Sequence, residues 1–426
     1  MGFDIEKASR AELRDIQDQR LEESVTAVYE NVDLYRKRLD EAGLSPSTID
    51  TTALTAVPFT TSADIRDEYP DGLFTVPTGD IQRVHTSSGT TGKPKIFGYT
   101  RDDLDTWSKI IARSLETSGF ESQYTVLNPC KYGLVSGGLG WHDGLEQLGA
   151  TVVPSATADM DRQIELIRDL TVDGLICFPS FALDLAGIIE RQGGDPTELS
   201  ISTITVGGEP TSQELRAEIA EAFDAVVTEH YGLSELFGAG IFTECEECQD
   251  GAHVWEDHFY PEIIDPRTDE RVDDGEEGEL VLTSLSKEAM PLLRYRTGDI
   301  ATMTTDECAC GRTHARISVT ERMRNGISID DTTVYPTEIE STFLTEPETA
   351  PYYRIDLQRT GQHDAINITI ERKQGLDVDQ SELADRLHER FLAELSLSVD
   401  EITIATPGTI DRTLGTKANR VYDNRE

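Results

Sequence analysis

The chain has 426 residues, more than a single hydrophobic core normally organises, so two or more domains are expected. Its 80 acidic residues against 38 Lys and Arg give a formal net charge of -42, which excludes the basic face that nucleic-acid binding requires. The acidic residues are spread along the whole chain, which is typical of halophilic proteins, whose surface carboxylates keep them hydrated in high salt.

No targeting or membrane-spanning segment is predicted. The chain begins Met1-Gly-Phe-Asp-Ile-Glu6, without a basic stretch followed by an apolar run, and no other stretch is long and apolar enough to cross a bilayer. We therefore expect a cytoplasmic protein with no membrane partner. Six cysteines in a chain of this length are too few for a disulfide framework.

The first elements expected are amphipathic helices over residues 9 to 43, because apolar residues recur there at helical spacing among many charges. Two short strands follow, at residues 81–85 and 96–99, joined by a loop. From residue 104 onward helices and strands alternate, which predicts an α/β fold whose sheets are covered by helices. The helices are expected at 104–117, after Gly140, and at 162–170, 181–191 and 212–223; the strands at 124–127, 151–154, 174–178, 203–206 and 225–229.

The second half of the chain changes character twice. From about residue 240 short β segments dominate, at 262–264, 279–284 and 300–303, and predict a β-barrel-like subdomain over about 240–320. Beyond residue 321 strands near 354 and at 366–371, a helix at 380–395 and a strand at 401–405 predict a small α+β domain. We therefore expect a large N-terminal domain, residues 1–320, and a C-terminal domain, residues 321–426.

The loop between the two short strands is rich in hydroxyls and glycines. Glycine lets the backbone approach a ligand closely, and Ser and Thr hydroxyls with free amides supply donors for a polyphosphate. A Walker loop is excluded, because it needs glycine at Ser87 and Ser or Thr at Pro94, and because it opens a helix. A surface turn of the same composition is the alternative. The candidate phosphate-binding residues are Ser87, Ser88, Gly89, Thr90, Thr91, Gly92 and Lys93.

Three further motifs lie at the ends of predicted strands, where α/β sheets commonly bind ligands. They are Gly207-Gly208-Glu209-Pro210, Glu229-His230-Tyr231-Gly232-Leu233-Ser234-Glu235 and Tyr295-Arg296-Thr297-Gly298-Asp299. The carboxylate of Asp299 could accept hydrogen bonds from both hydroxyls of a ribose. Alternatively, Gly298 and Asp299 only form a turn.

Together with the loop, these motifs resemble the adenylate-forming superfamily of acyl-CoA synthetases, and most closely the phenylacetate-CoA ligase family. The resemblance runs from about Val84 to the end of the chain, and includes the segments Tyr132 to Gly138, His253 to His258 and Gly415 to Val421. It implies the adenylate-forming fold and ATP-dependent activation of an organic acid to acyl-AMP, followed by transfer to CoA. It also implies Mg²⁺, an aryl acid such as phenylacetate as first choice of substrate, and a homodimer.

The resemblance also implies roles for individual residues. Lys417, one of only nine lysines, resembles the adenylation lysine that bridges the substrate carboxylate and the α-phosphate; a solvated surface lysine is the alternative. Glu235 resembles the magnesium carboxylate. Val135 stands where relatives often carry phenylalanine, which leaves the identity of the acid open. The residues expected at ATP are Gly208, Glu209, Pro210, His230, Tyr231, Gly232, Asp299 and Arg322, and those expected at the acyl group are Tyr132, Gly133, Phe181 and Gly208.

Four of the six cysteines fall into two close pairs, Cys245-Glu-Glu-Cys248 and Cys308-Ala-Cys310. Four thiolates suit a tetrahedral structural zinc ion, and some members of the family carry zinc in this region. The alternatives are reduced thiols without metal, or a site that takes one ligand from His253, His258 or His314.

The chain departs from the family at the hinge before its C-terminal domain. Glu321 and Asp331 stand where relatives generally carry glycine. In the family this domain swings after adenylation and guides CoA to the acyl-adenylate, so side chains on that route leave two rival functions open. One is adenylyl transfer to another acceptor, such as a deazaflavin coenzyme. The other is nucleotide binding without turnover.

Overall fold

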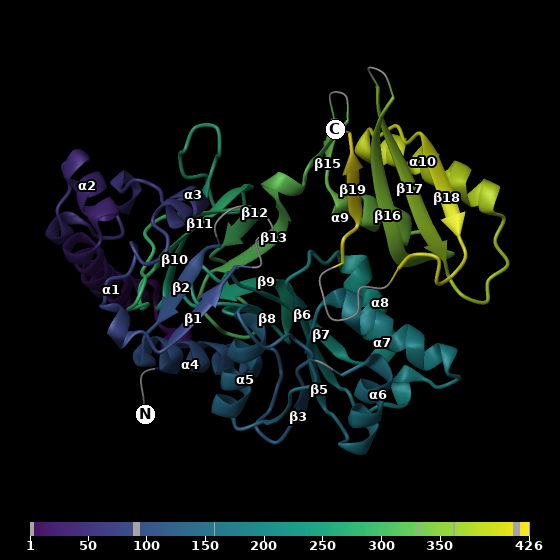
Figure 1. Cartoon of the computed structure of the whole chain (residues 1–426), viewed down its shortest axis with the longest axis horizontal. Coiled ribbons are helices and arrows are strands. Elements are labelled where there is room, and N and C mark those ends of the chain that lie inside the picture. Colours follow the sequence, from purple (N-terminus) through teal and green to yellow (C-terminus); the bar gives the residue numbers. More distant parts are fainter. Residues whose placement is uncertain are drawn as a thin grey trace. The chain divides into compact units, whose positions relative to one another are not determined.

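The computed structural model describes residues 4–87, 94–156, 158–329, 332–360, 363–411 and 418–425, and divides into two compact units (Figure 1). The first unit comprises Met1–Cys177, Ser200–Gly208 and Thr228–Thr320. The second comprises Phe178–Leu199, Glu209–Val227 and Glu321–Glu426. One boundary thus falls between Thr320 and Glu321, but two segments that the sequence assigns to the N-terminal domain belong to the second unit.

The helices of the first unit begin where the sequence supplies capping residues. Ser9 accepts a hydrogen bond from the Glu12 amide and Thr100 accepts one from the Asp103 amide, each as half of a capping box at a helix start. The two helices α1 and α2 confirm the prediction for residues 9 to 43. The helices of this unit are α1 (Arg10–Asn31), α2 (Asp33–Glu41), α3 (Ser62–Asp67), α4 (Arg101–Thr117), α5 (Gly137–Leu148) and α6 (Met160–Asp169).

Eleven strands of the described residues form one mixed sheet, in the order β10-β11-β12-β13-β9-β8-β7-β6-β5-β3-β4. The neighbours β4, β3, β5 and β6 are parallel, as the βα alternation predicts, whereas β7, β8, β9 and β13 and the set β10 to β12 pair antiparallel. The strands are β3 (Thr125–Leu127), β4 (Thr151–Val153), β5 (Gly174–Cys177), β6 (Thr203–Gly207), β7 (Val226–Tyr231), β8 (Phe242–Cys245), β9 (Cys248–Val254), β10 (Phe259–Ile264), β11 (Gly278–Ser284), β12 (Tyr295–Thr304) and β13 (Arg316–Arg322).

The β-rich stretch from about residue 240 to 320 is therefore continuous with the parallel strands rather than a sheet of its own. Strand β8 pairs with both β7 and β9, so it carries the sheet from its parallel part into its antiparallel part. The local sequence predicts three of these strands, β10, β11 and β12, but not β8, β9 and β13, and it contains no signal for which strands pair. That choice depends on side chains that are far apart in the chain.

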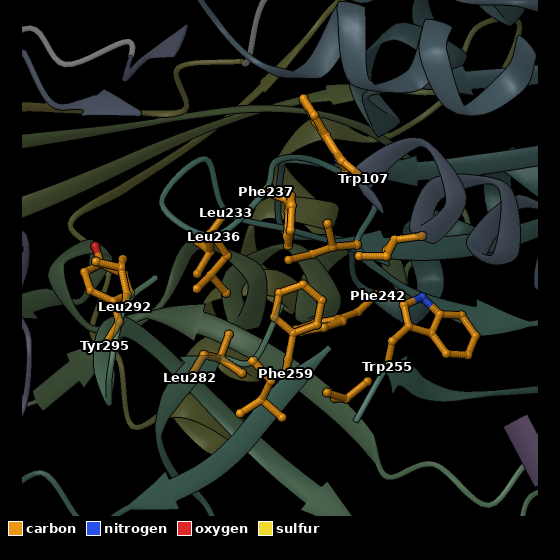
Figure 2. Close-up of a cluster of buried hydrophobic side chains, with 14 of the residues drawn as sticks. Trp107, Leu233, Leu236, Phe237, Phe242, Trp255, Phe259, Leu282, Leu292 and Tyr295 are labelled. Atoms are coloured by element: carbon orange, nitrogen blue, oxygen red, sulfur yellow. The ribbon is translucent and has the colours of Figure 1, made fainter. Parts of the chain in front are cut away.

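The core of the first unit combines side chains of the helices with aromatic and aliphatic side chains of the antiparallel strands and the loops beside them (Figure 2). Phe259 lies edge-on to Phe242 and to Phe237, with ring centroids 5.1 and 5.9 Å away. These three rings are fully buried. Edge-to-face contact of this kind adds to the hydrophobic stabilisation from burial alone.

Helices α4 and α5 pack closely because glycines of α5 face large side chains of α4. A Cβ atom at Gly140 would lie 2.2 Å from the Trp107 ring, and one at Gly144 would lie 2.1 Å from the Ile111 side chain. Any side chain at these positions would push the two helices apart. Gly137, in the same helix, has only the Ala239 side chain at 4.0 Å.

The second unit carries a four-stranded sheet in the order β18-β17-β16-β19. Its antiparallel pair β16 and β17 is flanked by parallel strands on both sides. This arrangement and its helix α10 agree with the α+β pattern expected beyond residue 321. The elements are α7 (Pro179–Arg191), α8 (Gln213–Phe223), β14 (Ile327–Ile329), β15 (Thr332–Val334), α9 (Pro336–Leu344), β16 (Thr349–Thr360), β17 (His363–Arg372), α10 (Gln380–Leu395), β18 (Glu401–Ala405) and β19 (Val421–Asn424).

Helix α8 belongs to the second unit because its side chains bond to residues beyond 321. The hydroxyl of Ser212, its N-cap, donates to Glu340 at 3.3 Å, and Ser341 donates to Glu214 at 2.9 Å. Lys373 forms an ion pair with Glu218. Such contacts link segments more than a hundred residues apart, and no local pattern in the sequence predicts them.

None of the helices in the described part of the chain is both long enough and apolar enough to cross a membrane.

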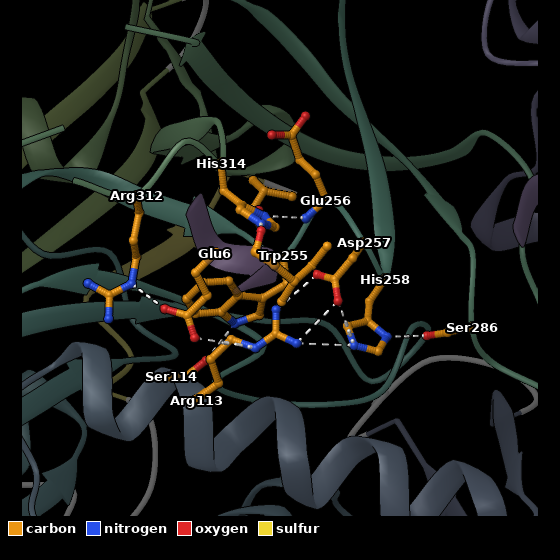
Figure 3. Close-up of polar contacts among 12 residues, drawn as sticks. Glu6, Arg113, Ser114, Trp255, Glu256, Asp257, His258, Ser286, Arg312 and His314 are labelled. Atoms are coloured by element: carbon orange, nitrogen blue, oxygen red, sulfur yellow. Dashed lines mark hydrogen bonds and ion pairs between the residues drawn. The ribbon is translucent and has the colours of Figure 1, made fainter. Parts of the chain in front are cut away.

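A polar network joins the N-terminal segment to the turn between β9 and β10 (Figure 3). Asp257 accepts hydrogen bonds of 2.9 and 3.2 Å from Arg113, and Glu6 accepts one of 2.7 Å from Arg312. His258 lies next to Asp257, with its Nδ1 atom 2.6 Å from the Ser286 hydroxyl. Burial lowers the pKa of His258 to about 3; the Asp257 charge opposes this shift, and the nearby Arg113 charge adds to it.

We expect Gly140→Ala to lower the free energy of unfolding by about 1 to 3 kcal/mol, because the added methyl group overlaps the Trp107 ring. Gly137→Ala, in the same helix, has room for the methyl group and should be neutral or slightly stabilising. Denaturant unfolding of both variants measures the difference. Equal stabilities would contradict the packing described for α4 and α5.

We also expect His258 to make stability depend on pH. Its folded pKa of about 3 lies below the ordinary 6.5, so between these values the unfolded state binds a proton that the folded state does not. The free energy of unfolding therefore falls as the pH falls through this window. In His258→Gln the side-chain amide can still form a hydrogen bond with Ser286 but does not titrate. The free energy of unfolding of this variant should therefore fall less steeply with falling pH than that of the wild type. Parallel curves for the two proteins would rule out this contribution.

Candidate functional site

The predicted hairpin around the phosphate loop is confirmed. Strands β1 (Arg83–Thr86) and β2 (Ile96–Tyr99) pair antiparallel, with Thr86 opposite Ile96. At the base of the loop the Ser87 amide donates to the Lys95 carbonyl at 3.2 Å, and the Lys95 amide donates to the Ser87 hydroxyl at 3.4 Å. The other predicted phosphate ligands, Ser88, Gly89, Thr90, Thr91, Gly92 and Lys93, lie outside the described residues.

Glu235 lies on the turn that follows β7 and forms an ion pair with Lys95. Its Oε1 atom also accepts a hydrogen bond of 3.1 Å from the Tyr295 hydroxyl, and the Lys95 ammonium donates to the Ser62 hydroxyl at 3.2 Å. Burial alone would raise the pKa of Glu235, but the charge and hydrogen bond of Lys95 outweigh burial and lower it. Glu235 is therefore an ionised, largely buried carboxylate, which suits a hard cation such as Mg²⁺.

A second lysine lies near this carboxylate. Lys287 is buried, and its ammonium is 4.3 Å from the centre of the Tyr99 ring, a cation–π contact. Its Nζ atom has no hydrogen-bond partner among the described residues. Burial lowers the pKa of Lys287 to about 8, while the charges of Asp103 and Glu235 oppose the shift.

Two of the residues expected at the nucleoside meet in the first unit. The Tyr231 hydroxyl donates to Asp299 Oδ2 at 2.5 Å, and the Tyr231 ring stacks on Phe242. Asp299 is 1% exposed, and it lies inside β12 rather than in the turn before a strand that the sequence predicts. The hydrogen bond holds Tyr231 and Asp299 at a fixed spacing.

The other motif residues of this unit are tightly packed. The His230 Nδ1 atom lies 3.2 Å from the Thr205 hydroxyl, between strands β6 and β7. A Cβ atom at Gly232 would lie 2.1 Å from the Gly238 carbonyl oxygen, so this position requires glycine for packing alone. Gly208 follows β6 with a positive φ of 78°. The glycines of these motifs are thus explained by backbone geometry, whether or not a ligand is bound.

The residue that follows Gly208, Glu209, belongs to the second unit. It accepts hydrogen bonds of 3.0 Å from the Ser180 hydroxyl and 2.6 Å from the Ala418 amide. Pro210 comes next and Arg322 ends β13. Lys417, the predicted adenylation lysine, lies outside the described residues, directly before Ala418.

Glu321, which replaces a family glycine, is buried and bonded to the start of α9. Its Oε1 atom accepts hydrogen bonds from the Thr337 amide, at 3.2 Å, and from the Thr337 hydroxyl. A carboxylate at the first turn of a helix is stabilised by the free amides there. Burial raises its pKa, and the Thr337 hydrogen bonds oppose that shift. Asp331, the second replacement, lies outside the described residues.

The residues expected at the acyl group fall in both units. Tyr132 accepts a hydrogen bond of 2.9 Å from Asn128 and lies 3.1 Å from His142 Nδ1. Gly133 follows with a φ of 140°. Phe181 is buried in the first turn of α7, in the second unit.

Three cysteines and one histidine form a candidate metal site. The ligand atoms of Cys245, His253, Cys308 and Cys310 all lie within 4.8 Å of one another. The Cys245 and Cys308 sulfurs are 3.5 Å apart, and Cys310 Sγ is 3.4 Å from His253 Nε2. Burial lowers the pKa of His253 to about 4, so its ring is neutral at ordinary pH. A Cys₃His set with a neutral imidazole suits structural zinc.

This arrangement changes the predicted ligand set at one position. Cys248 lies opposite Cys245 in the β8–β9 pair, and its sulfur accepts a hydrogen bond of 3.3 Å from Arg316. His253, further along β9, supplies the fourth ligand atom instead, as one of the alternatives allowed. The other two histidines considered, His258 and His314, are outside the group: His258 contacts Ser286, and the His314 ring nitrogens contact main-chain atoms.

Sequence reasoning gave no role to three residues around Glu235. Lys95, Tyr295 and Lys287 come from the hairpin, the start of β12 and the turn after β11. The sequence offered one signal for Lys95. Lysine is scarce in this acidic chain, and one of its few lysines lies two residues beyond the glycine-rich loop. Only the fold shows which carboxylate it meets.

Comparison with known proteins gives consistent matches. Residues 6–286 match the AMP-binding enzyme family, and residues 331–425 match the AMP-binding enzyme C-terminal domain. The phenylacetate-coenzyme A ligase of Thermus thermophilus is 41% identical over 440 residues, which cover 99% of both chains. The enzyme of the same name from Escherichia coli K12 is 38% identical over 427 residues, covering 99% of this chain and 97% of its own.

Among solved structures, a 2-hydroxyisobutyryl-CoA ligase in its postadenylation state matches with a TM-score of 0.92. The two sequences are 25% identical, and the match covers 99% of this chain and 91% of that chain. The expected adenylate-forming fold is thereby confirmed.

Proposed function

Since this chain belongs to the AMP-binding enzyme family, and within it to the phenylacetate-coenzyme A ligases, we propose that it activates an organic acid with ATP and transfers the acyl group to CoA. The acid and ATP give acyl-AMP and pyrophosphate, and the CoA thiol then displaces AMP. An aryl acid such as phenylacetate is the proposed substrate. The observation that carries the proposal is the similarity to phenylacetate-coenzyme A ligases over 99% of the chain, which includes the C-terminal part.

The arrangement around Glu235 supports the adenylation step. A carboxylate substrate and the α-phosphate of ATP repel each other, so their approach needs fixed positive charge. Glu235, ionised and largely buried, would hold Mg²⁺, which supplies charge neutralisation on the phosphate oxygens. The loop from Ser87 to Lys93 would hold the β- and γ-phosphates, and Lys417 would bridge the two reacting groups.

The nucleoside is proposed to bind beside the Tyr231 and Asp299 pair. Tyr231 would stack on adenine, with Gly208, Glu209 and Pro210 on its other face, while His230 and Gly232 shape the adjoining backbone. Asp299 would accept the ribose hydroxyls, for which its second carboxylate oxygen is suited. Arg322 is proposed as a further ribose or phosphate contact. Tyr132, Gly133, Phe181 and Gly208 are proposed to line the acyl group.

CoA is favoured over the two rival outcomes. The relatives that match over the full length are named as coenzyme A ligases, and the chain retains Glu235 and Asp299 with ordered partners. The Glu321 carboxylate is bonded to the start of α9, so it makes a local contact within its own unit. This contact supports a structural role for the residue that replaces the family glycine.

We expect purified protein with phenylacetate, ATP, Mg²⁺ and CoA to form phenylacetyl-CoA, AMP and pyrophosphate, detected by liquid chromatography and mass spectrometry. A panel of aryl and aliphatic acids ranks the substrates. An AMP–coenzyme adduct would favour the adenylyltransferase, and ATP binding without pyrophosphate release would favour the inactive nucleotide-binding protein. Lys417→Ala should abolish acid-dependent ATP–pyrophosphate exchange, whereas Lys373→Ala, at a half-exposed ion pair, should retain it.

A structural zinc ion is proposed at Cys245, His253, Cys308 and Cys310. Purified protein should contain about one equivalent of zinc, and chelation should lower its thermal stability. His253→Ala should lose most of the zinc, whereas Cys248→Ser should retain it. The opposite pattern in these two variants would restore the four-cysteine site, and zinc-free protein of unchanged stability would exclude both.

Three further features are proposed from the sequence and the family resemblance. The net charge of -42 supports the proposal that the protein functions in high salt, so the assays above should be run in high-salt buffer. A homodimer and a cytoplasmic location stay predictions.

A further inference from the structure

The ammonium of Lys95 lies on the carboxylate that the proposed function assigns to Mg²⁺. The Lys95 and Glu235 side chains are 15% and 11% exposed, so water screens their attraction only weakly. Lys95 and Tyr295 both donate to the same oxygen, Oε1, and Lys95 also donates to Ser62 at 3.2 Å. An inner-sphere or water-bridged Mg²⁺ at this oxygen would have to take the place of the ammonium.

The two lysines near Glu235 differ in how firmly they are held. The Lys287 ammonium is enclosed by the Tyr99 and Phe237 rings, at 4.3 and 5.6 Å, and its residue is 2% exposed. It acts as a fixed background charge. Lys95 stands on the hairpin just before β2, where a long flexible side chain can move its charge by several ångströms without moving the strand.

Removing the ion-pair partner of a buried carboxylate strongly destabilises the folded protein. Without metal, Glu235 therefore needs a positive charge of its own, which Lys95 supplies. With a metal present, two cations at one oxygen would repel each other. The same ammonium can then be satisfied by phosphate oxygens, which accept strong charge-assisted hydrogen bonds.

We propose that Lys95 is a tethered counter-ion of Glu235, which occupies the carboxylate until Mg²⁺ arrives together with ATP and then moves to the phosphates. The proposal rests on the proposed function, because that function assigns Mg²⁺ to Glu235. Lys95 is a positioning residue in the empty enzyme. The proposal predicts that Mg²⁺ binds Glu235 together with ATP rather than alone. Mg²⁺ alone meets a carboxylate that Lys95 already occupies, whereas ATP provides phosphate oxygens to which the displaced ammonium can bind.

The test is a titration with Mg²⁺ alone, without nucleotide, acid or CoA, followed by the apparent Tm and by calorimetric binding at constant ionic strength. Lys95→Met should have an apparent Tm several degrees below the wild type without metal. Mg²⁺ should raise the Tm of this variant and bind to it at least about tenfold more tightly than to the wild type. A tenfold change in Kd corresponds to about 1.4 kcal/mol of binding free energy. Lys37→Met, at an exposed ion pair with Glu41, controls for Mg²⁺ binding to the acidic surface.

The double variant Lys95→Met/Glu235→Gln completes the cycle. It should recover much of the lost stability and show no response to Mg²⁺ beyond that of Lys37→Met. If Lys95→Met alone fails to fold, folding of the double variant still identifies the uncompensated carboxylate as the cause. Failure of both variants to fold would overturn the proposal.

Two other results would overturn it as well. One is a Lys95→Met protein as stable as the wild type without metal; the other is equal Mg²⁺ binding by the two proteins. These outcomes are separate from a failure of the proposed function, which would appear as a wild type that forms no acyl-CoA. The titration uses neither acid nor CoA, so it reports on the Lys95 and Glu235 pair alone.

Discussion

Buried charge must be matched by opposite charge or by hydrogen bonds, and this constraint governs the structure of the first unit. The chain has more than twice as many acidic as basic residues, so cations are scarce. Several of them serve buried carboxylates. Arg294 bonds to Glu262 at 3.0 and 3.1 Å, Arg113 bonds to Asp257, and Lys95 bonds to Glu235. Each pair joins segments distant in the chain, so each also links separate parts of the fold.

The candidate site takes its residues from a separate two-stranded hairpin and from elements of the eleven-stranded sheet. The hairpin of β1 and β2 contributes Lys95, the turn after β7 contributes Glu235, and β12 contributes Tyr295 and Asp299. Backbone hydrogen bonds hold the strands within each sheet and do not depend on which side chains the strands carry, whereas the hairpin is linked to Glu235 through the side chain of Lys95. The fold can therefore persist while most of the sequence changes, as the match to the 2-hydroxyisobutyryl-CoA ligase at 25% identity and a TM-score of 0.92 illustrates.

Much of the fold follows from local sequence patterns, because helices and parallel strands are encoded by spacing and caps. The α/β alternation, the hairpin and the α+β pattern beyond residue 321 are of this kind. Partner choice is not local: β8 joins what was expected to be a separate barrel to the parallel strands, and α8 joins the second unit. The same limit applies to side chains. Cys248 has the sequence spacing of a metal ligand, but its sulfur accepts a hydrogen bond from Arg316. His253 supplies the fourth ligand atom of the candidate metal site instead. Lys95 likewise acquires a role only when the hairpin meets Glu235.

The shelter of the Lys95 and Glu235 pair matters for a protein with so acidic a surface. In about 1 M salt the Debye length is only about 3 Å, so ions screen most attractions between exposed charges. The exposed pair of Lys37 and Glu41, 4.0 Å apart, is subject to that screening. A pair that is almost closed to solvent is not, since dissolved ions cannot enter between its partners. Salt therefore acts unequally on the charges of this chain: it weakens ion pairs on the surface, whereas the sheltered Lys95 and Glu235 pair depends much less on the salt concentration.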